Sequence, residues 1–176
     1  MTADNIDLDI SVDGGDWTAR LPDYRQQITA CFTELVAHVP LARHFDKFNH
    51  LELSILLTDD KAIQQLNRDY RHKDSPTNVL SFPSLSGYEV DLFLKQGRDI
   101  PDYPVSLGDI IFACETLSRE ATAQGKSFRD HFCHLCLHGM LHLLGYDHMD
   151  ADQAEDMERL EKELLSKISI DDPYQD

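Results

Sequence analysis

The sequence predicts a single α+β domain in which a small mixed sheet is backed by helices. Segments with strand and helix patterns intermix along the chain without strict alternation, which favours this class over a parallel α/β fold. A length of 176 residues with 41% hydrophobic content suits one domain with a substantial core. An apolar, histidine-bearing helix at about residues 128–144 is expected to lie buried at its centre. We therefore expect one domain over residues 1–176, with a loose acidic tail at 171–176.

Four segments are expected to form the strands. Residues 5–12 and 50–57 alternate apolar with polar side chains, which is typical of strands with one buried face. Residues 79–82 predict a short strand ended by Pro83, and residues 106–112 predict another. Together they would form the small sheet.

Four further helices are expected around the central one. They cover residues 23–38, 59–70 and 115–124, and a last helix follows Asp150 as its N-cap. Each has an apolar stripe with charged residues opposite, so each should pack on one side of the core. The inward residues expected on three of them are Ile28, Cys31, Phe32, Leu35 and Val36; Ile63, Leu66 and Tyr70; and Ala154, Met157, Leu160, Leu164 and Ile168.

Residues 84–105 lack a clear period. Glycines and prolines interrupt the segment, which is long for a structureless connection. Two interpretations remain open, a flap over a functional site or an ordered hairpin.

The residues from His138 to His148 predict a metal site. His138 and His142 are one helical turn apart, about 6 Å in rise and roughly 40 degrees in rotation, so their rings point into the same space. Gly145 suits the left-handed turn that ends the helix and lets His148 come round to the other two. Three imidazoles leave a fourth tetrahedral position for water, the arrangement of catalytic zinc. The alternative is a set of ordinary buried histidines satisfied by hydrogen bonds.

Other metal-binding residue types lie nearby on the same helix. His134 is eight residues, about 12 Å, from His142, so we expect it to support the site or the core instead of sharing the ion. His131 is a weaker candidate still. Cys133 and Cys136 project away from His138 at 100 degrees per residue, and we expect buried, inert thiols.

The histidine spacing matches the long zincin signature, with one difference. Metalloproteases carry a glutamate general base directly after the first histidine, where this chain has Gly139. A peptidase built on this segment would lack its base.

Three segments resemble the YbeY family of bacterial zinc-dependent endoribonucleases. They are residues 138–148, residues 67–71 running into 76–83, and residues 107–110, so the resemblance spreads over most of the chain. It implies an α+β domain with one zinc ion held by His138, His142 and His148. It further implies single-strand-specific cleavage in the 3′-end maturation of 16S rRNA and in late ribosome quality control. The implied partners are rRNA and the small ribosomal subunit with its assembly factors.

The resemblance also implies a functional arginine at Arg71. The residues give independent support, because phosphodiester cleavage needs a fixed cation near the metal and Arg71 lies in a basic cluster with Arg68, His72 and Lys73. The alternative is a solvated helix end whose charge complements the helix dipole.

Charge and composition bear on how the protein meets RNA and on its cellular compartment. A net charge of −16 opposes unaided RNA binding, because phosphates repel an acidic protein. Many carboxylates lie in the first 16 residues and after residue 146, which leaves room for a local positive cleft and suggests that a ribosomal particle presents the substrate. Four cysteines without a disulfide pattern fit a reducing compartment. No apolar run approaches a membrane span, so we expect a cytoplasmic protein with no membrane partner.

The leading hypothesis is a metal-dependent endoribonuclease. Asp109 and Asp147 are candidates to assist as base, with orientation of a ligand histidine as their alternative role. The runner-up is a zinc peptidase or other amide hydrolase. A third hypothesis is a non-catalytic ribosome-assembly factor in which zinc, closed by a fourth protein ligand, staples the fold.

Overall fold

A four-stranded mixed sheet forms the middle of the protein. The computed structural model describes residues 4–175, and its strands run in the order β1-β2-β4-β3. The first three are parallel, and β3 is an edge strand antiparallel to β4. This confirms the α+β prediction. The strands are β1 (Ile6–Val12), β2 (Leu51–Thr58), β3 (Val79–Pro83) and β4 (Val105–Ala113).

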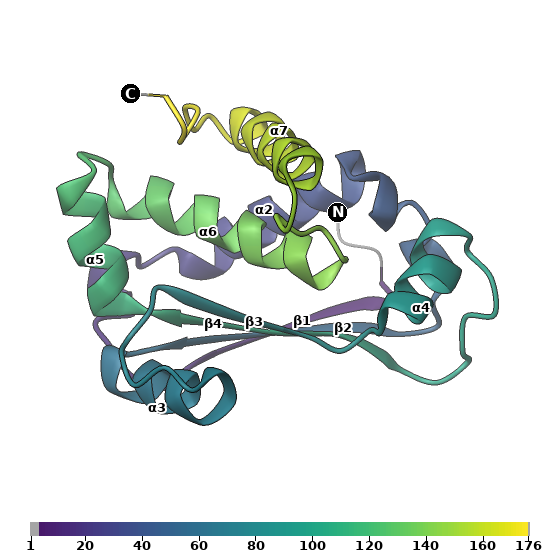
Figure 1. Ribbon diagram of the computed structural model, residues 1–176, viewed down its shortest axis with the longest axis horizontal. Coiled ribbons are helices and arrows are strands. Elements are labelled where there is room, and N and C mark those ends of the chain that lie inside the picture. The colour runs from purple at the N-terminus through teal and green to yellow at the C-terminus, as the bar shows by residue number, and fades with distance from the viewer. Residues whose placement is uncertain (1–3, 176) are drawn as a thin grey trace.

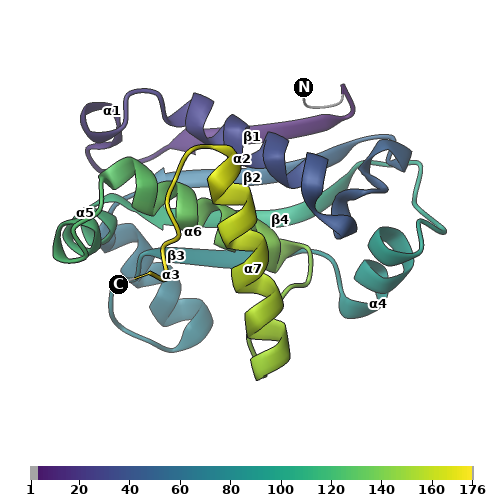
Figure 2. The ribbon, with the colours of Figure 1, turned by 90° about the horizontal axis from the view of Figure 1, so that it is seen from above.

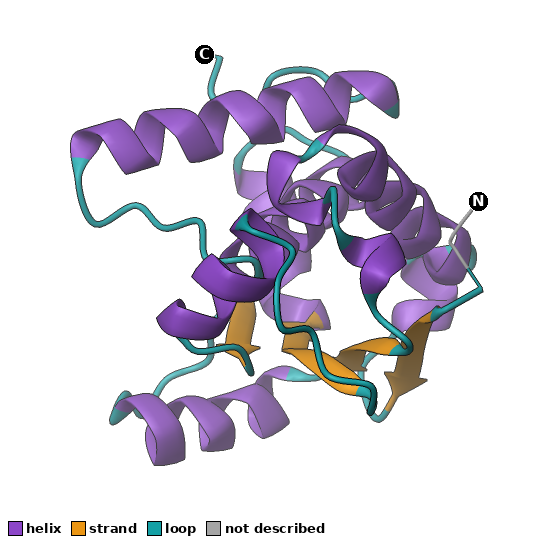
Figure 3. Cartoon of the chain, turned by 90° about the vertical axis from the view of Figure 1, so that its right-hand side faces the viewer, coloured by secondary structure: helices purple, strands orange, loops and turns teal. Residues whose placement is uncertain are grey.

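Most of the helices cover one face of this sheet. In Figure 1 the sheet is seen nearly edge-on, with α2, α5, α6 and α7 on one side and α3 alone on the other. Figure 2 shows α7 crossing above α2 and α6 as an outer layer, and Figure 3 shows the strands between α3 and the helical layers. The helices are α1 (Trp17–Arg20), α2 (Tyr24–His38), α3 (Asp60–Arg71), α5 (Cys114–Ala123), α6 (Phe128–Leu143) and α7 (Ala151–Lys167).

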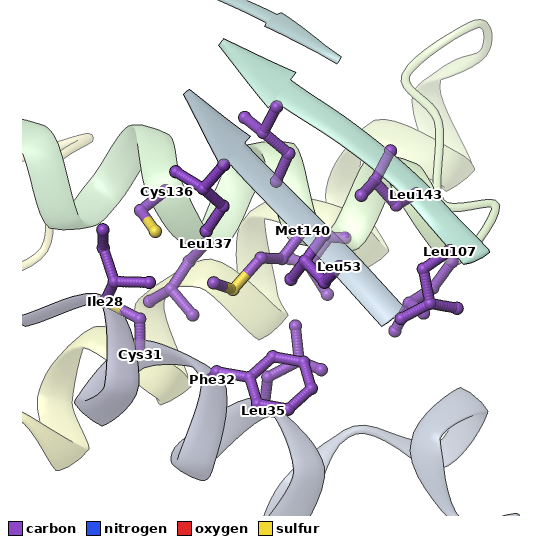
Figure 4. Close-up of a cluster of buried hydrophobic side chains, with 14 of the residues drawn as sticks. Ile28, Cys31, Phe32, Leu35, Leu53, Leu107, Cys136, Leu137, Met140 and Leu143 are labelled. Atoms are coloured by element: carbon purple, nitrogen blue, oxygen red, sulfur yellow. The ribbon is translucent and has the colours of Figure 1, made fainter. Parts of the chain in front are cut away.

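The central helix α6 lies where the sequence predicts it. Its N-cap is Ser127, whose side chain accepts a hydrogen bond from the Asp130 N–H, and Gly145 follows the helix with a φ of +103°. Apolar residues surround α6 because the sheet, α2 and α7 all pack on it. Figure 4 shows Leu137 and Met140 of α6 among side chains of α2 and of the sheet.

The segment between β3 and β4 forms helical turns instead of a hairpin. Ser86 and Glu89 make a reciprocal capping box that opens α4 (Gly87–Glu89), which continues into the π-helix η3 (Val90–Lys95). The expectation of a hairpin is wrong. The flap over a functional site stays a prediction: Val90 of η3 lies against the turn at Gly145, beside His142, while Phe93 and Leu94 are buried.

The C-terminal segment packs against the protein. Lys126 Nζ donates a hydrogen bond to the carbonyl of Pro173 at 3.1 Å, and the Tyr174 hydroxyl bonds to Glu161. The expectation of a loose tail is therefore wrong for residues 171–175, while Asp176 lies outside the described residues. A buried Ile170 anchors the segment, and Tyr174 finds a carboxylate that composition alone does not reveal.

One inward residue of α3 is wrongly predicted. Ile63 is buried and Leu66 half-buried, but Tyr70 is 68% exposed and packs edge-to-face with Phe82, with ring centroids 5.4 Å apart. The last turn of α3 is exposed from Arg68 to Arg71, so the helical period continues past the buried core. Within residues 4–175, no helix combines the length and apolar character that crossing a bilayer requires.

Candidate metal centre

Three histidine rings converge at the C-terminal end of α6. One ring nitrogen from each of His138, His142 and His148 lies within 4.8 Å of the other two. The first two residues are one turn apart on α6, and their Nε2 atoms are 3.0 Å apart. The turn at Gly145 brings His148 back, with its ring centroid 5.2 Å from that of His142. The folded chain thus assembles the three side chains that the spacing singles out.

Hydrogen bonds on the far side of two rings fix their tautomers. His142 Nδ1 donates to the carbonyl of Tyr146 at 3.0 Å, and His138 Nδ1 lies 2.5 Å from Glu161 Oε1, a carboxylate that only accepts. Each ring therefore carries its proton on Nδ1 and directs an Nε2 lone pair inward. Two lone pairs 3.0 Å apart repel unless a cation lies in front of both, so this donor set fits a metal ion.

The electrostatics favour the neutral form of His142. Burial, followed by the neighbouring His138 and His148, lowers the pKa of His142 below its ordinary value. A neutral imidazole is the form that coordinates a metal.

Glu161 of α7 is a site residue that the sequence reasoning missed. Its side chain is 1% exposed; burial opposes its ionisation, but hydrogen bonds from His134, His138 and Tyr174 outweigh burial and lower its pKa to about 2. The fold therefore holds a buried carboxylate anion against His138. A signal was present, because Met157, Glu161 and Leu164 follow one another at spacings of four and three along a single helix face.

The other candidates on α6 lie outside the triad. His134 Nε2 is 3.2 Å from the Tyr174 hydroxyl and 3.7 Å from Glu161, so His134 flanks the carboxylate instead of joining the cluster. Burial lowers the pKa of His131, whose ring bonds to Glu120 at 2.7 Å.

The cysteines of α6 are buried thiols, as predicted. Cys133 and Cys136 are both fully buried. The hydrogen bond with Cys31, together with burial, raises the pKa of Cys133 well above its ordinary value. The Cys133 thiol therefore stays protonated and unreactive.

The three histidines line a cavity that Arg71 also lines. The cavity has a volume of about 680 Å³ and is bounded by the three histidines, the end of α3 and the edge strand β3. Arg71 is exposed and forms no ion pair within residues 4–175, whereas Arg68 one turn earlier lies near Asp69 and Asp74. Arg71 is therefore free to meet an anion in the cavity.

The two candidate aspartates lie in different parts of the structure. Asp147 lines the histidine cavity and accepts the His148 backbone N–H at 2.7 Å. Asp109 is paired in register with Phe82 and Ser54 on the α3 face of the sheet, the face opposite α6. Because Arg71 and Asp147 are the cavity's only formal charges, a positive cleft is not formed by the described side chains alone.

Gly139 lies on the face of α6 that packs against the sheet. A Cβ placed there would be 3.0 Å from Ile110 Cγ2 and 3.1 Å from Ser81 Oγ. Position 139 therefore faces the sheet, and any side chain there would have to push Ile110 or Ser81 aside by a few tenths of an ångström. The base expected of a peptidase is absent, and a side chain at its position would be crowded.

Comparisons with known proteins agree on one family. The family model described as Endoribonuclease YbeY matches residues 16–169. Curated relatives with that name include proteins of Paramagnetospirillum magneticum, 44% identical over 96% of both chains, and of Sinorhizobium fredii, 41% identical over all of this chain and 95% of the relative. A solution structure from Thermotoga maritima has a TM-score of 0.53 at 19% identity and covers 96% of this chain and 99% of its own, which supports the fold.

Proposed function

The chain belongs to the endoribonuclease YbeY family, and from that premise we propose that it is a zinc-dependent endoribonuclease acting on single-stranded RNA. The observation that carries the proposal is the pair of inward Nε2 lone pairs of His138 and His142, 3.0 Å apart beside His148. They support assignment of the three histidines as ligands of one zinc ion, with the fourth position open. When bound, zinc would supply Lewis acidity toward a phosphate oxygen and acidify a coordinated water.

The chain's own residues bind and orient around that ion. Glu161 and the Tyr146 carbonyl hold the ligand rings in the required tautomer. Arg71, in the same cavity, would neutralise the charge that develops on the phosphate oxygens. Asp147 holds the backbone of His148 and thereby positions the third ligand.

The proposed substrate is ribosomal RNA presented on a particle. A net charge of −16 works against capture of free RNA, so affinity must come partly from a protein or assembled partner. We place the protein in the cytoplasm, acting on the 3′ end of 16S rRNA and in late quality control of the small subunit with its assembly factors.

Two rival functions are less well supported. Peptide hydrolysis lacks its base, because residue 139 is a glycine, and a side chain added there would be crowded by Ile110 and Ser81. A purely structural zinc would need a fourth protein ligand, and among the described residues no cysteine or carboxylate joins the three histidines.

The direct test is cleavage of an unstructured RNA by the metal-loaded protein. His138→Ala should abolish cleavage and lower the bound metal, while His50→Ala, a histidine that pairs with Glu52 on β2, should change neither. Full cleavage by metal-free His138→Ala protein would overturn the proposal, as would hydrolysis of a peptide library in place of RNA.

A further inference from the structure

A second hollow adjoins the histidine cavity. It has a volume of about 450 Å³ and lies on the α3 face of the sheet. Tyr70 and Phe82 line both spaces, so the two hollows meet at this aromatic pair on the open edge of the sheet. We call the second hollow the aromatic groove. It is lined by Ser11, Ser54, Leu56, Leu66, Tyr70, Phe82, Asp109, Ile110 and Ile111.

Apolar side chains make up the part of the groove nearest the cavity. Leu66 and Tyr70 are one turn apart on α3 and line the groove on the helix side, while Phe82 and Ile111 of β3 and β4 line it on the sheet side. Only α3 covers this face in the described chain, as Figure 1 shows, so the groove remains open beside it.

Packing of the hydrophobic core does not explain why an aromatic ring stands at position 70. Its ring is 68% exposed and rests edge-on against Phe82 at 5.4 Å. The ring therefore presents a free aromatic surface one residue before Arg71, at the mouth of the proposed active site. Exposed aromatic side chains beside a cation are the platforms on which unpaired bases stack.

The charges along the groove indicate which part of an RNA chain it can bind. Asp109 lies in the groove, and beyond it Asp9 and Glu52 are exposed on the same sheet face. A phosphate would be repelled from these carboxylates, whereas Arg71 favours one in the histidine cavity. A nucleobase has no formal charge and has apolar faces. Its amino groups can donate hydrogen bonds to the Asp109 carboxylate.

We propose that the aromatic groove binds an unpaired nucleobase of the RNA substrate, stacked on Tyr70 and adjacent to the nucleotide whose phosphate enters the histidine cavity. This inference rests on the proposed function and names a substrate-binding subsite for it. It explains a requirement for unpaired RNA, since a base held in a helix cannot swing onto Tyr70.

The test compares two tyrosines of equal exposure. Tyr70→Ala and Tyr103→Ala remove rings that are each 68% exposed, and Tyr103 does not line the groove. With an unstructured RNA oligonucleotide in a chelator, so that cleavage is prevented, Tyr70→Ala should weaken binding about 5- to 100-fold. Tyr103→Ala should bind like the wild type, and Tyr70→Phe, which keeps the ring, should retain most of the affinity.

A fluorescent base makes stacking visible. An oligonucleotide carrying 2-aminopurine beside the cleavage site should be quenched on binding to wild-type protein and to Tyr70→Phe, and much less by Tyr70→Ala. In metal-loaded protein, Tyr70→Ala should lower kcat/KM mainly through KM, and an abasic nucleotide at that position should remove the difference between wild type and variant.

The outcomes separate the two proposals. If the wild type neither binds nor cleaves RNA, the proposed function fails. If the wild type cleaves RNA while Tyr70→Ala and Tyr103→Ala bind and quench equally, only the groove assignment is overturned. Loss of ribosomal-particle binding by Tyr70→Ala with unchanged oligonucleotide binding would assign the groove to a protein partner and would also overturn it.

Discussion

The Nδ1 atom of His138 lies 2.5 Å from the Oε1 atom of Glu161, a residue 23 positions later on a different helix. The contact joins the proposed metal centre to α7, the outer layer of the fold. Tyr174 bonds to the other carboxylate oxygen, so the C-terminal segment reaches the site through Glu161. The orientation of the first ligand thus depends on chain segments well outside the histidine motif.

We predict that Glu161→Gln weakens metal binding about 10- to 100-fold, the usual effect of removing the carboxylate partner of a ligand histidine. The amide keeps the shape of the side chain but loses the charge that favours Nδ1–H on His138. Competition with a chromogenic chelator measures the affinity. Glu155→Gln, an exposed residue of the same helix, is the control, and equal affinities for the two variants would contradict the role of Glu161.

Arg71→Ala should lower kcat about 10²- to 10³-fold, the loss typical of removing one group that stabilises transition-state charge. Metal content should not change, because the arginine does not contact the histidines' ring nitrogens in the described structure. The control is Arg68→Ala, which removes an arginine already near Asp69 and Asp74. Wild-type kcat for Arg71→Ala would contradict the proposed role.

Gly139→Glu should destabilise the protein by about 1 to 3 kcal/mol or more without creating peptidase activity. The new side chain would have to displace Ile110 and Ser81, whose atoms lie 3.0 and 3.1 Å from the position of an added Cβ. Chemical denaturation measures the loss of unfolding free energy. Gly87→Ala, where an added Cβ meets nothing within 4 Å, should be nearly neutral, and a stable Gly139→Glu protein that cleaves peptides would refute the steric argument.

We predict that the Asp60 carboxylate makes a pH-dependent contribution to the free energy of unfolding. Burial alone would raise its pKa, but hydrogen bonds from Thr116 and Arg119 outweigh burial and lower the pKa below its ordinary value. The ionised form is therefore favoured in the folded state. Its contribution is present above the unfolded pKa and is lost as the pH falls below about 4, through the lower folded value.

Asp60→Asn should consequently reduce the free energy of unfolding at pH 7, and the difference from the wild type should shrink as the solution is acidified through that range. Denaturation curves at several pH values measure it, with the exposed Asp102→Asn as control. A difference that stays constant with pH would show that the Asp60 contact stabilises α3 without its charge.

Local signals in the sequence predicted much of this molecule. Asp150 caps α7 as expected, and the starts of α3 and α6 fall close to the predicted ones, where Asp59 and Ser127 are the caps, because a cap depends on residues only a few positions away. The convergence of His138, His142 and His148 also followed from short-range spacing and one glycine.

Features set by packing between distant segments were harder to predict. The buried carboxylate of Glu161 arises only when α7 lies across α6, and Tyr174 meets that carboxylate only through the fold of the C-terminal segment. The turns of η3 follow a π-helical period that a search for 3.6-residue or two-residue repeats does not detect. The separation of Asp109 from Asp147 required the sheet register.

The central claim is that the three histidines hold one zinc ion with a position open for chemistry. Metal analysis of the purified protein combined with X-ray absorption at the zinc edge tests it most directly. We predict one zinc per chain with three imidazole nitrogens and a non-protein oxygen. A fourth protein ligand, a sulfur in the coordination shell, or a His138→Ala protein with unchanged zinc content would contradict the account.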